Sequence, residues 1–396
     1  MKEDLSLSSL TFHLSSIPKG KLWELSTLKQ VDQLKRIIVV AGARPNFMKI
    51  ARLVERLKKN RGFECLLVHT GQHYDFVMSE VFFQELRIPK PDVFLNVGSG
   101  SHAEQTAKIM TTFEAVLLDE KPDLVVVAGD VNSTLACSLT AAKLHIKVAH
   151  IESGLRSFDR TMPEEINRIV TDALSDIYFV SEQSGVENLI REGAAKKSIH
   201  LVGSVMIDPV VRMAKAIDRS RILRRLDLKP QNYAVLTLHR PSNVDSAEML
   251  AEIYEILSAV SERIRLVYPI HPRTSDRMQT HDLLNQFTEL KDLQMIEPLG
   301  YLDFVKLVKD SRFVLTDSGS IQEETTYLHI PCLTMRDNTE RPSTVEMGTN
   351  KLVGRDKKVI TKAVDCILTG KWRPGRVPRY WDGKTTERIL DVLANP

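Results

Sequence analysis

The segment RIIVVAGARPNFMKIARLVERLKK (36–59) indicates the fold class of this chain. Its first part, RIIVVAG (36–42), is an almost unbroken apolar run, which is typical of a strand buried on both faces of a parallel sheet. A buried strand followed by an amphipathic helix begins a βαβ unit, so the stretch predicts a doubly wound α/β domain. In the helical part, apolar residues recur at helical spacing: Ile50, Leu53, Val54 and Leu57.

The same alternation continues along the chain in two series. The first series has strand-like runs at 36–42, 64–71, 123–130, 147–153, 176–182 and 199–204. The second series has them at 233–239, 265–271, 292–298, 312–318 and 330–336. We therefore expect two Rossmann-like doubly wound domains. Ligands of such sheets lie beyond the carboxyl ends of the strands, so both domains should face one cleft.

The predicted domain limits follow from these series. Residues 1–35 are expected to be an N-terminal extension outside the fold, and 36–204 to be the first Rossmann-like domain. The second domain is predicted at 205–375 and a C-terminal helix at 376–396. Near 203–208 one sheet ends and a helix begins that could bridge the two halves.

The bulk composition indicates a globular protein for a small ligand. The 396 residues carry 54 basic and 51 acidic side chains in mixed order, a net charge of +3, which argues against a surface that coats nucleic acid. We expect neither a secretory signal nor a membrane span, because no apolar run is long enough. A cytoplasmic protein with free thiols is the prediction for its four widely spaced cysteines: Cys65, Cys137, Cys332 and Cys366.

Phosphate binding is expected without the usual fingerprints. The first turn reads AGARPN, so the G-x-G-x-x-G pattern of NAD enzymes is absent, as is a phosphate loop ending in Gly-Lys-Ser/Thr. Arg44 and Lys49 instead open the predicted helix, where backbone N–H groups and the helix dipole favour an anion. A solvated helix start is the competing interpretation.

Acidic residues follow the strands of the first domain. Asp130 ends AGD and Glu152 ends HIE, each directly after a buried run. Asp130 could simply cap the next helix, whereas Glu152 is long for a cap. In TMPEEINR, Glu164 and Glu165 stand in the first turn of a helix, where acidic residues are favourable anyway. Several carboxylates in one cleft raise one another's pKa, which favours general acid–base chemistry.

The second domain supplies basic and hydroxyl groups. His239 and Arg240 follow one strand and His271 and Arg273 another, positions suited to a diphosphate, although the prolines of YPIHPRT also fit a rigid turn.

In DSGSIQEETTYL, Ser318 and backbone N–H groups suit a phosphate, and Glu324 can accept both hydroxyls of a ribose. Arg341 can then reach the phosphate or sugar, so a nucleoside diphosphate joined to a sugar is the expected ligand.

Together these segments resemble the non-hydrolysing UDP-N-acetylglucosamine 2-epimerase family. The resemblance runs from about residue 36 to the C-terminus and rests on GARPNFMKIA, HTGQHYD, AGDVNSTLA, HIESGLRSFDRTMPEEINR, LHRPSN, LTDSGSIQEE and MRDNTERPSTVEMGTN. It implies the two-domain fold of many nucleotide-sugar glycosyltransferases (GT-B-like), a homodimer, and no metal or NAD. The implied reaction converts UDP-GlcNAc to UDP-ManNAc by eliminating UDP to a bound glycal and adding it back.

The resemblance also assigns residues. The family's catalytic carboxylates match Asp130, Glu152 and Glu164, whose division of labour stays open, and its essential histidine matches His239. Positions that hold UDP match Arg44, Lys49, Phe304, Ser318, Gly319, Ser320, Glu324 and Arg341. A neighbouring site where bacterial members bind a second UDP-GlcNAc as activator resembles Gln72, His73 and His271. Many members have a second glycine where this chain has Ser320, and we expect a helical backbone there rather than a strained one.

Other activities compete with this interpretation. A hydrolysing relative would release ManNAc and UDP, whereas a glycosyltransferase or a UDP-sugar sensor leaves the carboxylates without a task. Close relatives act on a UDP-sugar with a second acetamido group at C3 and a carboxylate at C6. Arg156, Arg160 and Arg168 are candidates to contact that carboxylate, and equally plausible as solvated or ion-paired residues.

Overall fold

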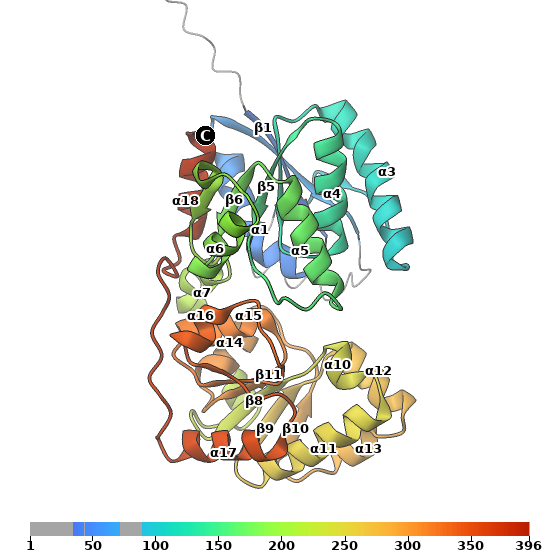
Figure 1. Ribbon diagram of the computed structural model, residues 1–396. Coiled ribbons are helices and arrows are strands. Elements are labelled where there is room, and N and C mark those ends of the chain that lie inside the picture. The colour runs from blue at the N-terminus through green and yellow to red at the C-terminus, as the bar shows by residue number, and fades with distance from the viewer. Residues whose placement is uncertain (1–34, 43, 72–88, 396) are drawn as a thin grey trace, which may run out of the picture.

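The computed structural model describes residues 35–42, 44–71 and 89–395. The predicted extension therefore falls outside the described residues, apart from Lys35, which begins the first strand. Gln72 and His73 also fall outside them, as does the side chain of Arg44. Figure 1 shows two lobes, one above the other, each built on a sheet with helices on its faces.

The first lobe contains a parallel sheet in the order β3-β2-β1-β4-β5-β6-β7. Its strands are β1 (Lys35–Ala41), β2 (Phe63–His69), β3 (Val93–Phe94), β4 (Leu124–Ala128), β5 (Lys147–Ile151), β6 (Ile177–Val180) and β7 (Ile199–Leu201). Its helices are α1 (Arg44–Lys59), α3 (His102–Glu120), α4 (Asn132–Lys143), α5 (Pro163–Leu174) and α6 (Gln183–Arg191), with a short 3-10 turn at Lys196–Ser198.

The apolar stripe read from the first helix forms the core as predicted. Ile50, Leu53, Val54 and Leu57 are all buried in one cluster with Ile37 and Val39 of β1.

The second lobe has a parallel sheet in the order β10-β9-β8-β11-β12-β13. Its strands are β8 (Tyr233–Thr237), β9 (Arg265–Pro269), β10 (Leu293–Ile296), β11 (Val314–Thr316), β12 (Cys332–Thr334) and β13 (Asn350–Leu352). Its helices are α10 (Pro241–Val244), α11 (Ala247–Ser261), α12 (Pro272–Thr280), α13 (Leu284–Thr288), α14 (Tyr301–Lys309), α15 (Gly319–Tyr327), α16 (Pro342–Glu346) and α17 (Lys357–Leu368). Two parallel sheets flanked by helices confirm the predicted α/β fold.

The chain crosses between the lobes twice. The first crossing runs through α7 (Ile207–Arg212), α8 (Ala214–Asp218) and α9 (Ile222–Arg225), and α7 packs against both α1 and α15. After α17 the chain returns to the first lobe and ends in α18 (Thr385–Ala394), as Figure 1 shows. Residues 376–384 precede this helix without joining it, because Gly383 adopts a φ of 77°.

The returning helix is held by apolar and polar contacts with the first lobe. Ile389, Leu390 and Leu393 belong to the same buried cluster as the β1 side chains. Asp208 accepts the backbone N–H groups of Thr385 and Thr386 at 3.0 and 2.7 Å. In the part of the chain that the structure describes, no helix is both long and apolar enough to cross a membrane.

Candidate active site

A cavity of about 2250 Å³ lies between the carboxyl ends of the two sheets. Strand ends of both lobes reach it, because His69 ends β2, Asp130 follows β4 and His239 follows β8. The cavity therefore lies where parallel sheets of this type bind ligands. Among the predicted site residues, those that line it are Lys49, Asp130, Glu164, His239, His271, Phe304, Ser318, Gly319, Ser320, Glu324 and Arg341.

Glu152 does not line the cavity directly but lies behind two cations that do. Its Oε2 is 2.7 Å from Lys49 Nζ and 3.7 Å from an Nη of Arg341, and all three residues are buried. Glu152 has a φ of 68°, and Gly129 has a φ of 70°. A Cβ at Gly129 would lie 2.6 Å from Lys49 Nζ, so this glycine leaves the space through which the lysine reaches the carboxylate.

Asp130 is an ionised carboxylate at the cavity wall rather than a helix cap. Helix α4 begins after Val131, and no side chain caps its N-terminus. Asp130 instead forms an ion pair with Arg168. Burial alone would raise the pKa of Asp130, but the charges of Arg168 and Lys49 hold it below its ordinary value.

The adjacent carboxylates of α5 have different surroundings. Glu165 is buried and accepts the backbone N–H groups of Ser157 and Phe158 at 3.0 and 2.9 Å, so it closes the loop before the helix. It also pairs with Arg168 at 2.7 Å. Glu164 is exposed to the cavity, and its side chain has no hydrogen bond or ion pair within the described ranges. Of Glu164 and Glu165, Glu164 is therefore the one free to meet a ligand.

His239 is oriented by a buried aspartate. Its Nδ1 is 2.9 Å from Asp317 Oδ1, and Asp317 also accepts the backbone N–H groups of His239 and Arg240. Burial would raise the pKa of Asp317, but its bond to His239 and those N–H groups lower it to about 2. The carboxylate thus fixes the proton on Nδ1 and leaves Nε2 for a ligand.

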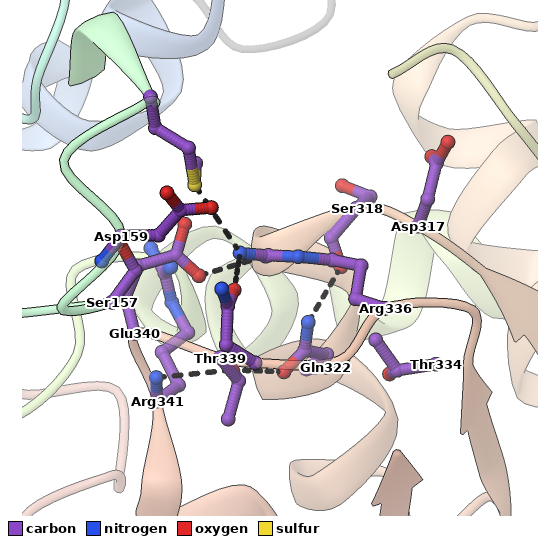
Figure 2. Close-up of polar contacts among 12 residues, drawn as sticks. Ser157, Asp159, Asp317, Ser318, Gln322, Thr334, Arg336, Thr339, Glu340 and Arg341 are labelled. Atoms are coloured by element: carbon purple, nitrogen blue, oxygen red, sulfur yellow. Dashed lines mark hydrogen bonds and ion pairs between the residues drawn. The ribbon is translucent and has the colours of Figure 1, made fainter. Parts of the chain in front are cut away.

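A cluster of arginines surrounds Glu340 near the middle of the cavity. Arg336 lies 2.8 Å and Arg240 3.3 Å from this carboxylate, and Arg168 reaches it from the first lobe at 3.9 Å. Burial opposes ionisation, yet Arg336 and Arg341 hold the pKa of Glu340 well below its usual range. Figure 2 shows the Arg336 guanidinium directed at Glu340, and one of its nitrogens is also 2.9 Å from Asn338 Oδ1.

Helix α15 begins at the cavity with its first turn under Arg341. A Cβ on Gly319 would lie 2.8 Å from Arg341 Nη1, so glycine allows this close approach. Arg341 Nε donates to Glu323 at 2.5 Å. Burial, and then the charge of Glu323, raise the pKa of Glu324 to about 8. Ser320 lies inside the helix without a positive φ, as expected from the sequence.

None of the three arginines considered for a substrate carboxylate lines the cavity. Arg156 is buried between Asp172 and Glu192 and does not line the cavity. Arg168 is neutralised by Asp130 and Glu165, and the exposed Arg160 lies outside the cavity lining.

Two residues of the site had no role assigned from the sequence. Asp317 stands at the end of an apolar run, the same position that drew attention to Asp130, and this was the available signal. Glu340 had no such signal, since only the fold brings four arginines around it.

Comparisons with known proteins place this geometry in context. The family model described as UDP-N-acetylglucosamine 2-epimerase matches residues 55–394. A UDP-N-acetylglucosamine 2-epimerase of Methanocaldococcus jannaschii is 42% identical over 90% of this chain and 98% of its own length. A UDP-2,3-diacetamido-2,3-dideoxy-D-glucuronate 2-epimerase of Pseudomonas aeruginosa is 39% identical over 91% and 99%.

A solved structure also resembles this chain over most of its length. The crystal structure of the Methanocaldococcus jannaschii UDP-GlcNAc 2-epimerase in complex with UDP-GlcNAc and UDP matches with a TM-score of 0.84. It is 42% identical, and the match covers 91% of this chain and all (100%) of that one.

Proposed function

The chain belongs to the UDP-N-acetylglucosamine 2-epimerase family, and on this premise we propose that it interconverts UDP-GlcNAc and UDP-ManNAc without hydrolysis. The observation that carries the proposal is the division of the cavity into two walls. Carboxylates of the first lobe, Asp130 and Glu164, face cations and a helix N-terminus of the second. Such a cavity holds a diphosphate on one side and moves a proton on the other.

The second lobe holds UDP in this proposal. The N-terminus of α15 offers the backbone N–H groups of its first turn to the diphosphate, and Ser318 and Arg341 add donors beside it. Glu324 takes the ribose hydroxyls, and the half-buried Phe304 on α14 packs against the uracil. Lys49 from the first lobe completes the phosphate contacts, and a phosphate contact of Arg44 stays a prediction from the family resemblance.

The reaction begins with loss of UDP. The C2 proton of the sugar passes to Asp130 while the C1–O bond to UDP breaks, which leaves a glycal with a C1=C2 double bond. His239, with its Nδ1–H held by Asp317, donates to the departing diphosphate through Nε2 when the ring carries a second proton there. UDP then adds back to C1 while Glu164, which has taken a proton from solvent, delivers it to the opposite face of C2, and Asp130 releases the abstracted proton to solvent. Glu152, fixed between Lys49 and Arg341, stabilises these cations rather than moving the proton.

The alternative substrate is the diacetamido uronate, since a relative with that activity is 39% identical to this chain and one named for UDP-GlcNAc is 42% identical. A homodimer, and a second UDP-GlcNAc that activates the enzyme at Gln72, His73 and His271, stay predictions from the family resemblance. Of these three residues, His271 lies within the described ranges and lines the cavity.

Proton NMR of the purified protein with UDP-GlcNAc in deuterated water tests the proposal. We expect UDP-ManNAc to appear with deuterium at C2. Free ManNAc and UDP would instead indicate a hydrolysing enzyme. Turnover of only the diacetamido uronate would move the substrate to the alternative, and inertness with both would refute epimerisation.

A further inference from the structure

His69 has no part in the proposed reaction, yet its ring is fixed at the cavity wall. It ends β2 and stacks between two phenylalanines. Its ring centroid lies 4.9 Å from that of Phe47 and 4.5 Å from that of Phe94, with interplanar angles of 28° and 16°. The side chain cannot turn without breaking both stacks, so its two ring nitrogens have fixed directions.

The hydrogen bond of one nitrogen determines where the proton lies. The backbone N–H of Gly71 donates to Nδ1 of His69 at 2.7 Å. A backbone N–H has no lone pair to offer, so Nδ1 must accept and the ring proton must lie on Nε2. Burial lowers the pKa of His69 to about 4, which keeps the ring neutral near pH 7. His69 is therefore a fixed, uncharged donor through Nε2.

This donor has no recipient in the described parts of the chain. His69 is only 8% exposed, and Nε2 forms no hydrogen bond with any described residue. An N–H group of a largely buried ring that lines a cavity and has no protein partner is placed to donate to a ligand in that cavity.

The neighbouring part of the wall is also polar. Asn132 donates to Gln105 at 2.8 Å and contacts the ring of His102 at 3.1 Å, and Asn167 donates to Asn132 at 3.3 Å. All four line the cavity. Beside His69, Thr70 and Ser133 share a hydrogen bond of 2.8 Å, which ties the end of β2 to the start of α4. Amide and imidazole groups can donate to and accept from the hydroxyl and acetamido groups of a sugar.

We propose that His69 donates its Nε2–H to an uncharged oxygen on the sugar ring of the bound UDP-sugar, a hydroxyl or the acetamido carbonyl. This inference rests on the proposed function. In the sheet order β2 lies two strands from β4, a separation of roughly 10 Å. The contact is therefore to a substituent of the sugar and not to the carbon that changes configuration, and His69 acts on binding more than on chemistry.

The test compares the binding of UDP-GlcNAc and of UDP by isothermal titration calorimetry with the full chain. His69→Phe keeps an aromatic ring between Phe47 and Phe94 but removes the donor. We expect the Kd for UDP-GlcNAc to rise about tenfold, as for a lost hydrogen bond, while the Kd for UDP and the melting temperature stay unchanged. The kcat should change less than twofold.

His200→Phe is the matched control, because His200 also packs on an aromatic ring, 6.1 Å from Phe179, but does not line the cavity. It should leave both dissociation constants unaltered. An unchanged Kd for UDP-GlcNAc in His69→Phe, or an equal loss of affinity for UDP, would overturn the sugar contact. A loss of UDP-GlcNAc affinity confined to a second, weaker binding event would also overturn the sugar contact. If the wild-type protein binds UDP-GlcNAc and His69→Phe weakens this binding, but no turnover is seen, the proposed reaction alone is refuted. If the wild-type protein does not bind UDP-GlcNAc, both the reaction and the sugar contact are refuted.

Discussion

At the scale of single residues, the site depends on buried charges that compensate one another. Glu152 lies in the interior with Lys49 and Arg341 as its partners. A buried carboxylate costs free energy unless such cations accompany it. Each ion pair therefore needs both partners, and substitution of one partner should make burial of the other unfavourable.

Lys49→Met tests this pairing. The variant leaves Glu152 with the more distant arginine alone, so we expect a loss of about 3 kcal/mol in the free energy of unfolding. We also expect kcat/KM for UDP-GlcNAc to fall at least a hundredfold. Chemical denaturation and steady-state kinetics measure the two effects.

The double variant Lys49→Met with Glu152→Gln separates the effect on stability from the effect on activity. Without the uncompensated charge, most of the stability should return while activity stays low. If the double variant instead loses as much stability as the two single variants lose together, Lys49 and Glu152 are not coupled.

Glu324 gives a prediction in pH. Its pKa in the folded protein is raised to about 8, from an ordinary value of 4.5. Between these values the folded state holds a proton that the unfolded state has lost, so the contribution of Glu324 to stability is full below pH 4.5 and is lost as pH rises towards 8. Wild-type stability relative to that of Glu324→Gln should fall by up to about 1.4 kcal/mol per pH unit in this window. Urea denaturation at several pH values measures it, and parallel curves for both proteins would contradict the raised pKa.

At the scale of elements, the sequence predicted those that carry a long signal. Runs such as 123–130 have enough consecutive apolar residues to identify a buried strand, and β4 was found there. The edge strands β3 (Val93–Phe94) and β13 (Asn350–Leu352) were not predicted, because two or three residues are too few to show a period. The first turn of α5 was predicted from Pro163, yet only the structure separates the buried Glu165 from the free Glu164.

Helix α15 provides a test at this scale. Gly319→Ala places a Cβ within 2.8 Å of Arg341 Nη1, and Arg341 cannot move freely because it is paired with Glu323 and Glu152. We expect the affinity for UDP to fall about tenfold, since the displaced guanidinium no longer faces the helix N-terminus. Calorimetric titration with UDP measures it.

Gly62→Ala is the control for this substitution, since a Cβ there meets only Asn60 Oδ1, at 3.3 Å, and Gly62 does not line the cavity. Equal UDP affinity for the two alanine variants would rule out the steric explanation.

At the scale of the whole molecule, the sequence indicated two lobes but not how they touch. Arg168 and Glu340, or Glu182 and the backbone N–H of Ser343, are partners from different lobes that no local pattern pairs. Their meeting depends on the relative placement of two sheets, which is a tertiary property. For the same reason the sequence suggested catalytic carboxylates at strand ends but did not reveal the cluster of arginines around Glu340.

Truncation after residue 384 tests the role of the returning helix. It removes Ile389, Leu390 and Leu393, each worth roughly 1.5–3 kcal/mol when buried, and leaves Asp208 without the N–H groups of Thr385 and Thr386. We expect hydrogen exchange to accelerate in β1 and α1, with less change in β8 and α11. Faster exchange in the second lobe first would contradict this assignment.

The double crossing between the lobes also limits how they can move. The second lobe is attached to the first by two separate chain segments, one through α7 and one that leads to α18. A body joined at one point can swivel in any direction, but one joined at two points turns mainly about the line through them. The lobes should therefore rotate mainly about this line, so that each closure brings the same residues of the two lobes together.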